Sequence, residues 1–268
     1  MLKRKNINYS KARKLYLKQL KKDKIWVVFW QIALFAIFLG LWQLFSTTGI
    51  IDPFFFSSPT RIVSTIAELA RQGNLWVHIW TSLYETVIGF LLASAIGFIV
   101  AVALWWSEKL RKILEPYLVI LNSLPKIALG PMIIFWVGSG TGATIVMCVL
   151  ICVIITTIST LNAFISCDSD KILLMKSMHA NKFQIFFKLV LPSALPDFVS
   201  VLKINVGMSW VGTIMGEYLS SKAGLGYLIN YGSQILKLDI VLTSIAILCV
   251  LAGGMYILVS AVEKRFKK

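Results

Sequence analysis

Three ionisable side chains lie inside otherwise apolar stretches and are the strongest candidates for chemistry in this sequence: Lys126, Lys203 and Glu217. A charge at membrane depth is costly, so such residues typically mark the path of an ion or a polar solute. Lys126 has an alternative explanation, because a lysine stem can stay buried while its amine reaches the headgroups. Glu217 is expected to reach the outer interface. Further residues complete a candidate solute path: Asn122, Asn205, Ser209, Trp210 and Thr213.

The stretch 195–216 also contains Gly207, Gly212 and Gly216 among several hydroxyl side chains. Small residues at this density let helices approach one another closely. Lining a translocation cavity is the alternative, and the sequence leaves both open.

Residue patterns typical of enzymes are absent from the sequence. There is no GxxxxGK[ST] motif, and the glycine-rich GSGTG at 138–142 lacks the lysine of a phosphate-binding loop, so a tight turn is expected there. No Ser-His-Asp, HExxH or paired-carboxylate pattern is found. The four cysteines show no CxxC spacing, and His78 and His179 fall on opposite sides of the expected membrane. We therefore expect no catalytic site, no metal and no cofactor in this chain.

Composition indicates the surroundings in which these residues act. Of the 268 residues, 57% are hydrophobic and 15% are charged, and the mean hydropathy is +0.78. The charges cluster and leave apolar runs of about 20 residues, the length of helix that crosses a bilayer. Barrel strands would alternate apolar and polar residues, which these runs do not. The sequence predicts an all-α integral membrane protein with six transmembrane helices, at about 25–45, 81–105, 117–137, 142–164, 195–216 and 238–261.

The positive charges indicate the orientation of the chain. Ten of the 27 Lys and Arg residues precede residue 25, three lie in 107–112, four in 165–190 and four after residue 263. Segments rich in Lys and Arg stay on the cytoplasmic side, so both termini are expected there. This placement also explains the +15 net charge without nucleic-acid binding. We expect a plasma-membrane protein with a basic cytoplasmic tail at 1–24, a permease domain in the lipid bilayer at 25–262 and a second basic tail at 263–268.

Two stretches should depart from straight spans. Pro125 and Pro131 each remove a backbone donor from 117–137, so this span is expected to be kinked. The first outer connection, SSPTRIVSTIAELARQG, predicts a helix lying in the interface, with Pro59 in its first turn and Gly73 beyond its end.

Residues 170–190 lie between the fourth and fifth spans, yet they are too charged to cross a bilayer. The run CDSD offers Ser169 or Asp170 as the cap of a short helix that ends near Met178. The helical pattern then breaks at His179.

A second helix is predicted after this break. Asn181 can cap it, with Gln184 three residues later as in a capping box. Pro192 and Pro196 mark the start of the fifth span. The apolar residues of this helix recur on one face, which either lies on the leaflet or under its own bundle, or docks into a groove of a soluble partner. This face consists of Phe183, Phe186, Phe187 and Val190.

The segment resembles the cytoplasmic EAA signature of binding-protein-dependent ABC transporter permeases. Read back from Leu191-Pro192, the EAA positions fall on Leu173, Leu174 and Met175, and the signature glycine falls on His179. MSWVGTIMGEYLSSKAGLGYLINYGSQ is similar to the nitrate, sulfonate and taurine branch of that family, as is LNSLPKIALGPMIIFWVG in the third span. The resemblance covers about residues 60–262. Two positions depart from the signature: Leu173 stands where the signature has an acidic residue, and His179 stands where it has glycine. Because His is among the non-Gly residues enriched at positive φ, the turn should survive.

The resemblance implies the fold of a type I ABC importer permease with a cytoplasmic coupling helix. It also implies a second permease copy, as a homodimer or a similar heterodimer, cytoplasmic ATPase subunits that bind ATP and Mg, and an extracytoplasmic solute-binding protein. The solute is expected to be small and anionic, such as nitrate, a sulfonate or taurine. Another solute such as a vitamin precursor, or a non-ABC channel or carrier, is the alternative. The coupling residues are expected to be Ser177, Met178, His179, Ala180, Asn181, Phe183 and Phe186, with Leu191 and Pro192 as a rigid exit.

Overall fold

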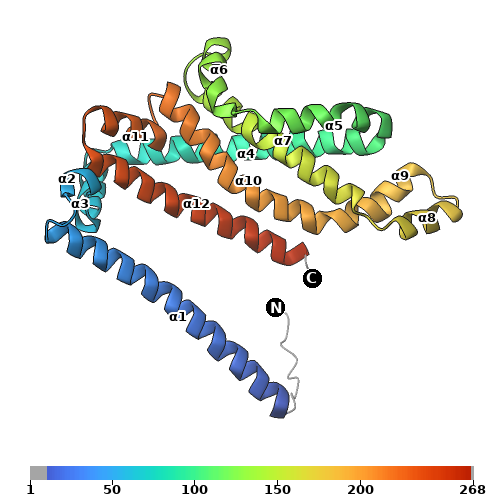
Figure 1. The fold of residues 1–268 in the computed structure, drawn as a ribbon, viewed down its shortest axis with the longest axis horizontal. Helices are drawn as coiled ribbons and strands as arrows, with labels where there is room; N and C mark the ends of the chain where they lie inside the picture. The colour runs from blue at the N-terminus through green and yellow to red at the C-terminus, as the bar shows by residue number, and fades with distance from the viewer. Residues whose placement is uncertain (1–10, 267–268) are drawn as a thin grey trace. The chain divides into compact units, whose positions relative to one another are not determined.

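The computed structural model describes residues 11–266, and within this range the protein consists of helices without strands. Backbone contacts divide the chain into two compact units, Met1–Ile62 and Val63–Lys268. The outermost parts of the predicted basic tails, residues 1–10 and 267–268, lie outside the described range. Figure 1 shows the order of the helices along the chain.

The first unit contains the long helix α1 (Lys11–Thr47) and the short helix α2 (Pro53–Phe56). Large apolar side chains are exposed along α1, as expected of a helix surrounded by lipid. The predicted first span at 25–45 lies within α1, and the described part of the predicted tail continues the same helix. The Asp52 carboxylate accepts a hydrogen bond from the Phe54 N–H at 2.8 Å and caps α2.

Helix α3 (Pro59–Arg71) confirms the helix predicted for the first connection. At its start the Ser58 hydroxyl accepts a hydrogen bond from the Arg61 N–H at 3.3 Å. Gly73, with a φ of +78°, ends this stretch and leads into the next helix. Glycine suits this position because it adopts positive φ without steric cost.

The second unit is organised around three long helices, of which α7 packs against both of the others (Figure 1). Their bounds are α4 (Asn74–Trp106), α7 (Thr141–Ile165) and α10 (Leu191–Ser220). They confirm three predicted spans, and each extends beyond the predicted ends. α11 (Leu225–Gln234) and α12 (Leu238–Phe266) follow α10 and pack against it.

Glycines set the separation between α10 and α7. A Cβ on Gly212 would lie 2.6 Å from the Cα of Cys148, and one on Gly216 would lie 2.6 Å from the Cα of Thr144. Real Cβ atoms do not approach backbone atoms so closely, so the two helices meet at this distance only because these residues lack side chains. Gly212 and Gly216 therefore serve close packing, whereas Gly207 has no atom within 4 Å of its Cβ direction.

The predicted third span is broken into two helices that meet at 84°. They are α5 (Glu108–Ser123) and α6 (Gly130–Val137), joined by the 3₁₀ turn η1 (Lys126–Leu129). Leu124 is extended, at φ −65° and ψ 137°, because the ring of Pro125 disfavours the helical conformation of the residue before it. The kink expected in 117–137 is therefore present, and it breaks the span into two helices at Leu124–Pro125. Among the described residues, five helices can cross a membrane by length and composition, and the bent pair counts as a sixth if it forms one span.

Candidate functional site

The segment between α7 and α10 folds into two short helices that meet at a sharp corner at one end of the second unit (Figure 1). The first, α8 (Ser169–Ser177), is capped by Asp168, whose carboxylate accepts a hydrogen bond from the Asp170 N–H at 2.9 Å. This hydrogen bond holds the pKa of Asp168 below its usual value. The predicted caps, Ser169 and Asp170, are wrong because both residues lie in the first turn of α8. The helix dipole stabilises an acidic side chain such as Asp170 at this position.

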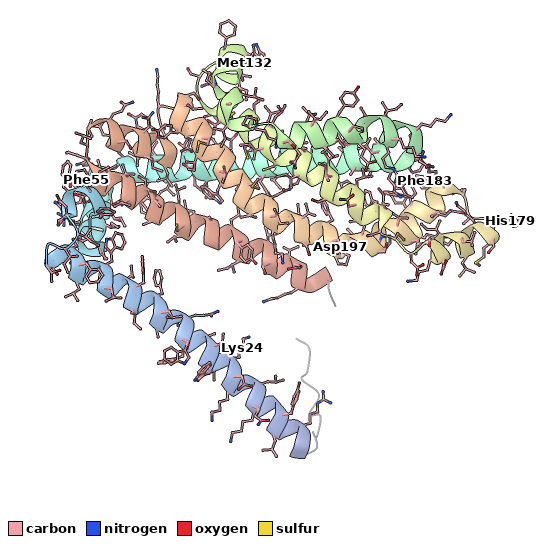
Figure 2. The ribbon with its side chains drawn as sticks, in the orientation of Figure 1. Lys24, Phe55, Met132, His179, Phe183 and Asp197 are labelled. Atoms are coloured by element: carbon pink, nitrogen blue, oxygen red, sulfur yellow. The ribbon has the colours of Figure 1, made fainter. Side chains whose placement is uncertain are left out.

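α8 ends in a Schellman motif at His179. The Ala180 N–H donates to the Met175 carbonyl at 2.9 Å, and the His179 N–H donates to the Lys176 carbonyl at 2.9 Å. His179 has a φ of +58°, which confirms the predicted turn at the position where the signature has glycine. His179 lies at the tip of the corner (Figure 2).

Replacing His179 with glycine should leave this corner intact, whereas valine should distort it. Glycine adopts positive φ freely, while a side chain with a branched Cβ is strained there by roughly 1–2 kcal/mol. The measurement is limited trypsin cleavage of the purified protein at Lys176 and Lys182, which flank the corner. We expect cleavage of His179→Val to be about 5–30-fold faster than that of the wild type, and His179→Gly to match the wild type. Equal rates for the two variants would contradict the role of this φ.

The second helix, α9 (Lys182–Ile185), begins as predicted. The Gln184 N–H donates to Asn181 Oδ1 at 2.8 Å, and the Asn181 N–H donates to Gln184 Oε1 at 3.0 Å, which completes a capping box. The Lys182 amine donates to the carbonyl of Trp106, the last residue of α4. A cation at a helix C-terminus is favoured by the helix dipole, so Lys182 ties the corner to α4.

The aromatic face predicted for this helix is divided by a π-helical turn, η2 (Phe186–Val190), in which the Leu191 N–H donates to the Phe186 carbonyl. A π turn places side chains out of step with the 3.6-residue period. Phe186 and Val190 are 2% and 0% exposed, whereas Phe183 and Phe187 are 59% and 48% exposed. The prediction of one continuous face is therefore wrong, and Phe186 is buried within its own chain.

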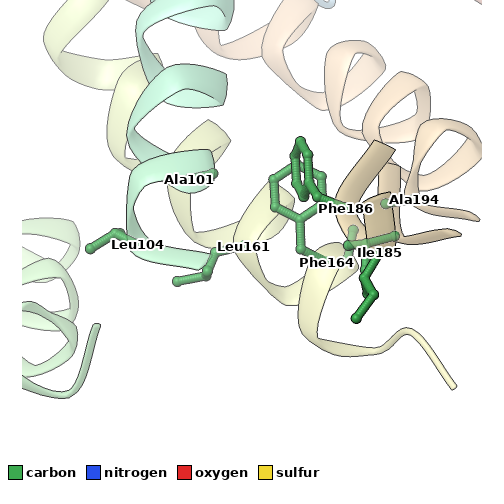
Figure 3. Packing of buried hydrophobic residues seen from close by; sticks show 9 residues of the cluster. Ala101, Leu104, Leu161, Phe164, Ile185, Phe186 and Ala194 are labelled. Atoms are coloured by element: carbon green, nitrogen blue, oxygen red, sulfur yellow. The ribbon is translucent and has the colours of Figure 1, made fainter. Parts of the chain in front are cut away.

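Phe186 belongs to a hydrophobic cluster that joins the corner to the ends of α4 and α7. Its ring centroid lies 4.8 Å from that of Trp105 on α4 and 5.5 Å from that of Phe164 on α7. Figure 3 shows Phe186 beside Phe164, with Ile185 and Ala194 close by. Packed aromatic pairs contribute beyond the apolar area that they bury, so this cluster fixes the corner to the bundle.

The side chains that remain outside this cluster form an exposed apolar surface on α8, α9 and the residues that directly follow each of them, which we call the corner surface. Each of its residues is between 48% and 73% exposed, and Phe183 is visible in Figure 2. Among the other predicted coupling residues, Ser177 is exposed and donates to the Leu174 carbonyl at 2.7 Å, Ala180 packs against the cluster, Leu191 is half-buried and Pro192 lies in the first turn of α10. An exposed apolar patch on well-fixed helices is typical of an interaction site. The corner surface consists of Leu173, Leu174, Met178, Phe183 and Phe187.

Comparison with known proteins decides what kind of protein carries this corner. Residues 93–268 match the family described as binding-protein-dependent transport system inner membrane component. The chain belongs to this family. A probable ABC transporter permease protein of Haemophilus influenzae is 30% identical to it, over 86% of this chain and 94% of that protein.

Two further relatives carry names that state a solute. The putative aliphatic sulfonates transport permease protein SsuC of Bacillus subtilis is 26% identical, over 87% of this chain and 84% of its own. The formylaminopyrimidine transport permease protein ThiX of Halalkalibacterium halodurans is 29% identical, over 72% and 76%. The inward-facing MetNI methionine ABC transporter superimposes with a TM-score of 0.65 at 21% identity, over 72% of this chain and 98% of that chain, which shows a common fold.

These findings confirm the predicted family with its sulfonate-type branch, the all-α membrane fold and the multi-pass location in the plasma membrane. The permease is a transport component of an ABC importer.

Several predicted path residues of the permease face α7 instead of a common cavity. Asn205 Nδ2 donates to Thr156 Oγ1 of α7 at 2.6 Å. Asn205, Ser209 and Thr213 are each 0% exposed. In the single chain these three side chains therefore belong to the packed contact between α10 and α7.

The two predicted residues Lys203 and Trp210 face a different neighbour, α12. Lys203 Nζ lies 2.7 Å from Glu263 Oε2, and Ser200 donates to Glu263 Oε1 at 3.1 Å. Trp210 is 5% exposed and packs with apolar residues of α12. Lys203 thus has a paired carboxylate within its own chain.

Asn122 and Lys126 lie at the bend between α5 and η1. Lys126 Nζ donates to the Asn122 carbonyl at 3.0 Å, and the Asn122 side chain is exposed. Of the predicted path residues, these two remain open to a solute in the single chain.

The prediction that Glu217 reaches the outer interface is wrong, because its side chain is 0% exposed. Its Oε2 accepts a hydrogen bond from the Gly226 N–H at 2.6 Å. Glu85 of α4 is also 0% exposed and lies within hydrogen-bonding reach of Glu217. Sequence reasoning did not single out Glu85, although an acidic residue inside the apolar run 81–105 was a sufficient signal.

A cleft of about 520 Å³ lies among α3, α4, α11 and α12, at the end of the second unit opposite the corner (Figure 1). His78, Tyr227 and Tyr231 form a stack on its wall, with ring centroids 5.8 Å and 6.1 Å apart. His78 Nδ1 accepts a hydrogen bond from the Gly224 N–H at 3.0 Å. The cleft is polar and open, and so differs in character from the apolar corner surface.

Proposed function

We propose that this permease forms the membrane path of an ATP-driven importer and that its corner surface binds a cytoplasmic ATPase subunit. The observation that carries the proposal is the corner surface itself. Five large apolar side chains stay exposed on a segment whose backbone is fixed by a cap, a Schellman motif, a capping box and the buried Phe186. Such a surface suits a helix that docks into a groove of a partner.

ATP and Mg would bind to the ATPase subunits, and a second copy of the permease would complete the path. The excess of Lys and Arg in the tail, at 107–112 and at 165–190 supports a cytoplasmic location of the corner and of both termini. The polar cleft at the opposite end would then face the extracytoplasmic side, where a solute-binding protein delivers the solute.

Coupling requires that the ATPase bind one conformation of the permease more tightly than another, because a partner shifts populations only by its differential affinity. The corner surface supplies the contact, and the anchoring of Phe186 and Lys182 joins this contact to α4 and α7. Movement of the ATPase subunits on ATP binding would therefore reach the spans directly.

The test replaces exposed residues of the corner surface with aspartate and measures how much ATPase subunit copurifies with the tagged permease. Met178→Asp and Phe183→Asp should each reduce recovery about 30-fold, since removing a central apolar anchor costs about 2 kcal/mol or more. Leu236→Asp is the matched control, because Leu236 is 63% exposed in the turn between α11 and α12. Recovery of ATPase at the control level with both corner variants, at equal amounts of permease in the membrane, would refute the docking.

For the solute, we propose a small organic anion of the sulfonate type. The support is the similarity to the sulfonate permease SsuC together with Lys126, a cation at the bend of the broken span. A formylaminopyrimidine is the second candidate, favoured by the similarity to ThiX. The cognate binding protein should gain several degrees in Tm with alkanesulfonates and none with the pyrimidine. The opposite result would assign the second candidate.

A further inference from the structure

Two carboxyl groups face each other in the interior of the second unit, and the transport assignment gives neither a role. Glu85 on α4 and Glu217 on α10 are each 0% exposed, and their side chains lie within hydrogen-bonding reach of one another. They lie where the first turn of α7 and the loop before α11 meet these two helices. Each carboxyl therefore lies inside the protein at a junction of four helices.

The groups around the pair are neutral. Glu217 Oε2 accepts from the Gly226 N–H at 2.6 Å, and Ser82 lies within reach of the same carboxyl. Thr141 and Thr144 on α7 lie beside Glu85. Both oxygens of Glu85 and Oε1 of Glu217 are buried without an aligned hydrogen-bond partner.

No positive charge compensates the pair in the part of the chain that the structure describes. The ion pairs there join other residues, and neither carboxyl has a lysine or arginine partner. His78 of α4 is a further titratable group that contacts the same loop, through the Gly224 N–H. Because His78 Nδ1 accepts that hydrogen bond, its ring needs no second proton. The α11 side contributes the phenol of Tyr227, stacked on His78.

Two carboxylates in contact cannot both be ionised in a low-dielectric interior, since each charge loses its hydration and the charges repel one another. A single proton held between them removes one charge and supplies the donor that the unpartnered oxygens lack. We infer that Glu85 and Glu217 form a proton-binding site that joins α4 to α10. Among the described residues, no group of three or more His, Cys, Asp or Glu side chains could hold a metal ion.

The site makes the stability of this junction dependent on pH. Near neutral pH the folded protein keeps a proton that the separated carboxyls of the unfolded chain have already released, because a free Glu carboxyl titrates at about pH 4. The stability contributed by the pair is therefore fully present below this pH, falls as the pH rises from there to the titration of the folded pair, and is level above it. A difference of one proton lowers the folding equilibrium constant by about tenfold for each pH unit.

The test follows the Tm of the full-length permease in lipid nanodiscs from about pH 6 to about pH 9. The Tm of the wild type should fall across this range. Glu85→Gln should reduce this slope at least by half. The glutamine N–H can donate to Glu217 in place of the shared proton, and an amide does not titrate. Glu115→Gln removes an exposed carboxyl on α5 and is the matched control, with the wild-type slope expected.

A second measurement uses the wild-type protein alone, so it does not depend on whether a variant folds. The infrared band of a protonated carboxyl should be present in the wild type near neutral pH and should disappear at high pH. Absence of this band, or equal pH slopes for Glu85→Gln and the wild type, would overturn the proposal. A Tm that rises with sodium chloride but not with choline chloride, at a pH where the band is absent, would overturn it in favour of a bound cation.

Discussion

Replacing Gly212 with alanine should weaken this permease by forcing two of its long helices apart. The added Cβ would lie 2.6 Å from the Cα of Cys148, so α10 and α7 would have to move apart along their contact. Overpacking of a well-packed interior costs about 1–3 kcal/mol, and here the obstacle is backbone, which cannot rotate away. Helix association inside a membrane relies on such close packing, because apolar side chains already surrounded by lipid gain little hydrophobic free energy when they contact another helix.

Gly207→Ala provides the control on the same helix. Its Cβ would meet no atom within 4 Å, and alanine is about 1 kcal/mol better than glycine in a helix interior. We expect the Tm of the purified protein in micelles to fall by several degrees for Gly212→Ala and to stay the same or rise for Gly207→Ala. Two equal Tm values would mean that α7 and α10 are not held at this separation.

Replacing Phe186 with alanine should release the corner from the bundle and cost about 3–5 kcal/mol. The Phe186 ring is 2% exposed and contacts Trp105 and Phe164 on two different long helices. Phe187→Ala is the matched control, because Phe187 is 48% exposed in the same π turn. The variants should differ by several degrees in Tm.

Phe186→Ala and Phe183→Asp together separate anchoring from docking. Phe186→Ala should lower both the Tm and ATPase copurification, whereas Phe183→Asp at the corner surface should lower copurification with little change in Tm. A Phe186→Ala protein with the Tm of Phe187→Ala would show that the aromatic cluster does not hold the corner.

The sequence was sufficient to predict features that depend on one segment of chain. The spans follow from apolar length, and the capping box of Asn181 with Gln184 follows from residues three positions apart. The turn at His179 was also accessible, because few residue types adopt positive φ. Each of these depends on local chemistry that no distant contact overrides.

Features that depend on packing between helices could not be predicted from the sequence. A π turn breaks the 3.6-residue period on which the aromatic face was predicted, so Phe186 turned inward while Phe183 stayed exposed. The predicted path residues of α10 share a helix, yet Asn205 faces α7 and Lys203 pairs with α12. The arrangement of the helices decides which neighbour each side chain meets, and the residue pattern along one helix does not predict that arrangement.

The continuity of the chain from α9 into α10 has a mechanical consequence. Residues Lys182–Ser220 form one continuous helical stretch of 39 residues, which at 1.5 Å per residue is about 58 Å long. The π turn η2 and Pro196 lie within this stretch, and both are places where helices bend. Phe183 lies at one end of the stretch and Glu217 near the other. A displacement of the corner would therefore be carried toward Glu217 through these two bending points.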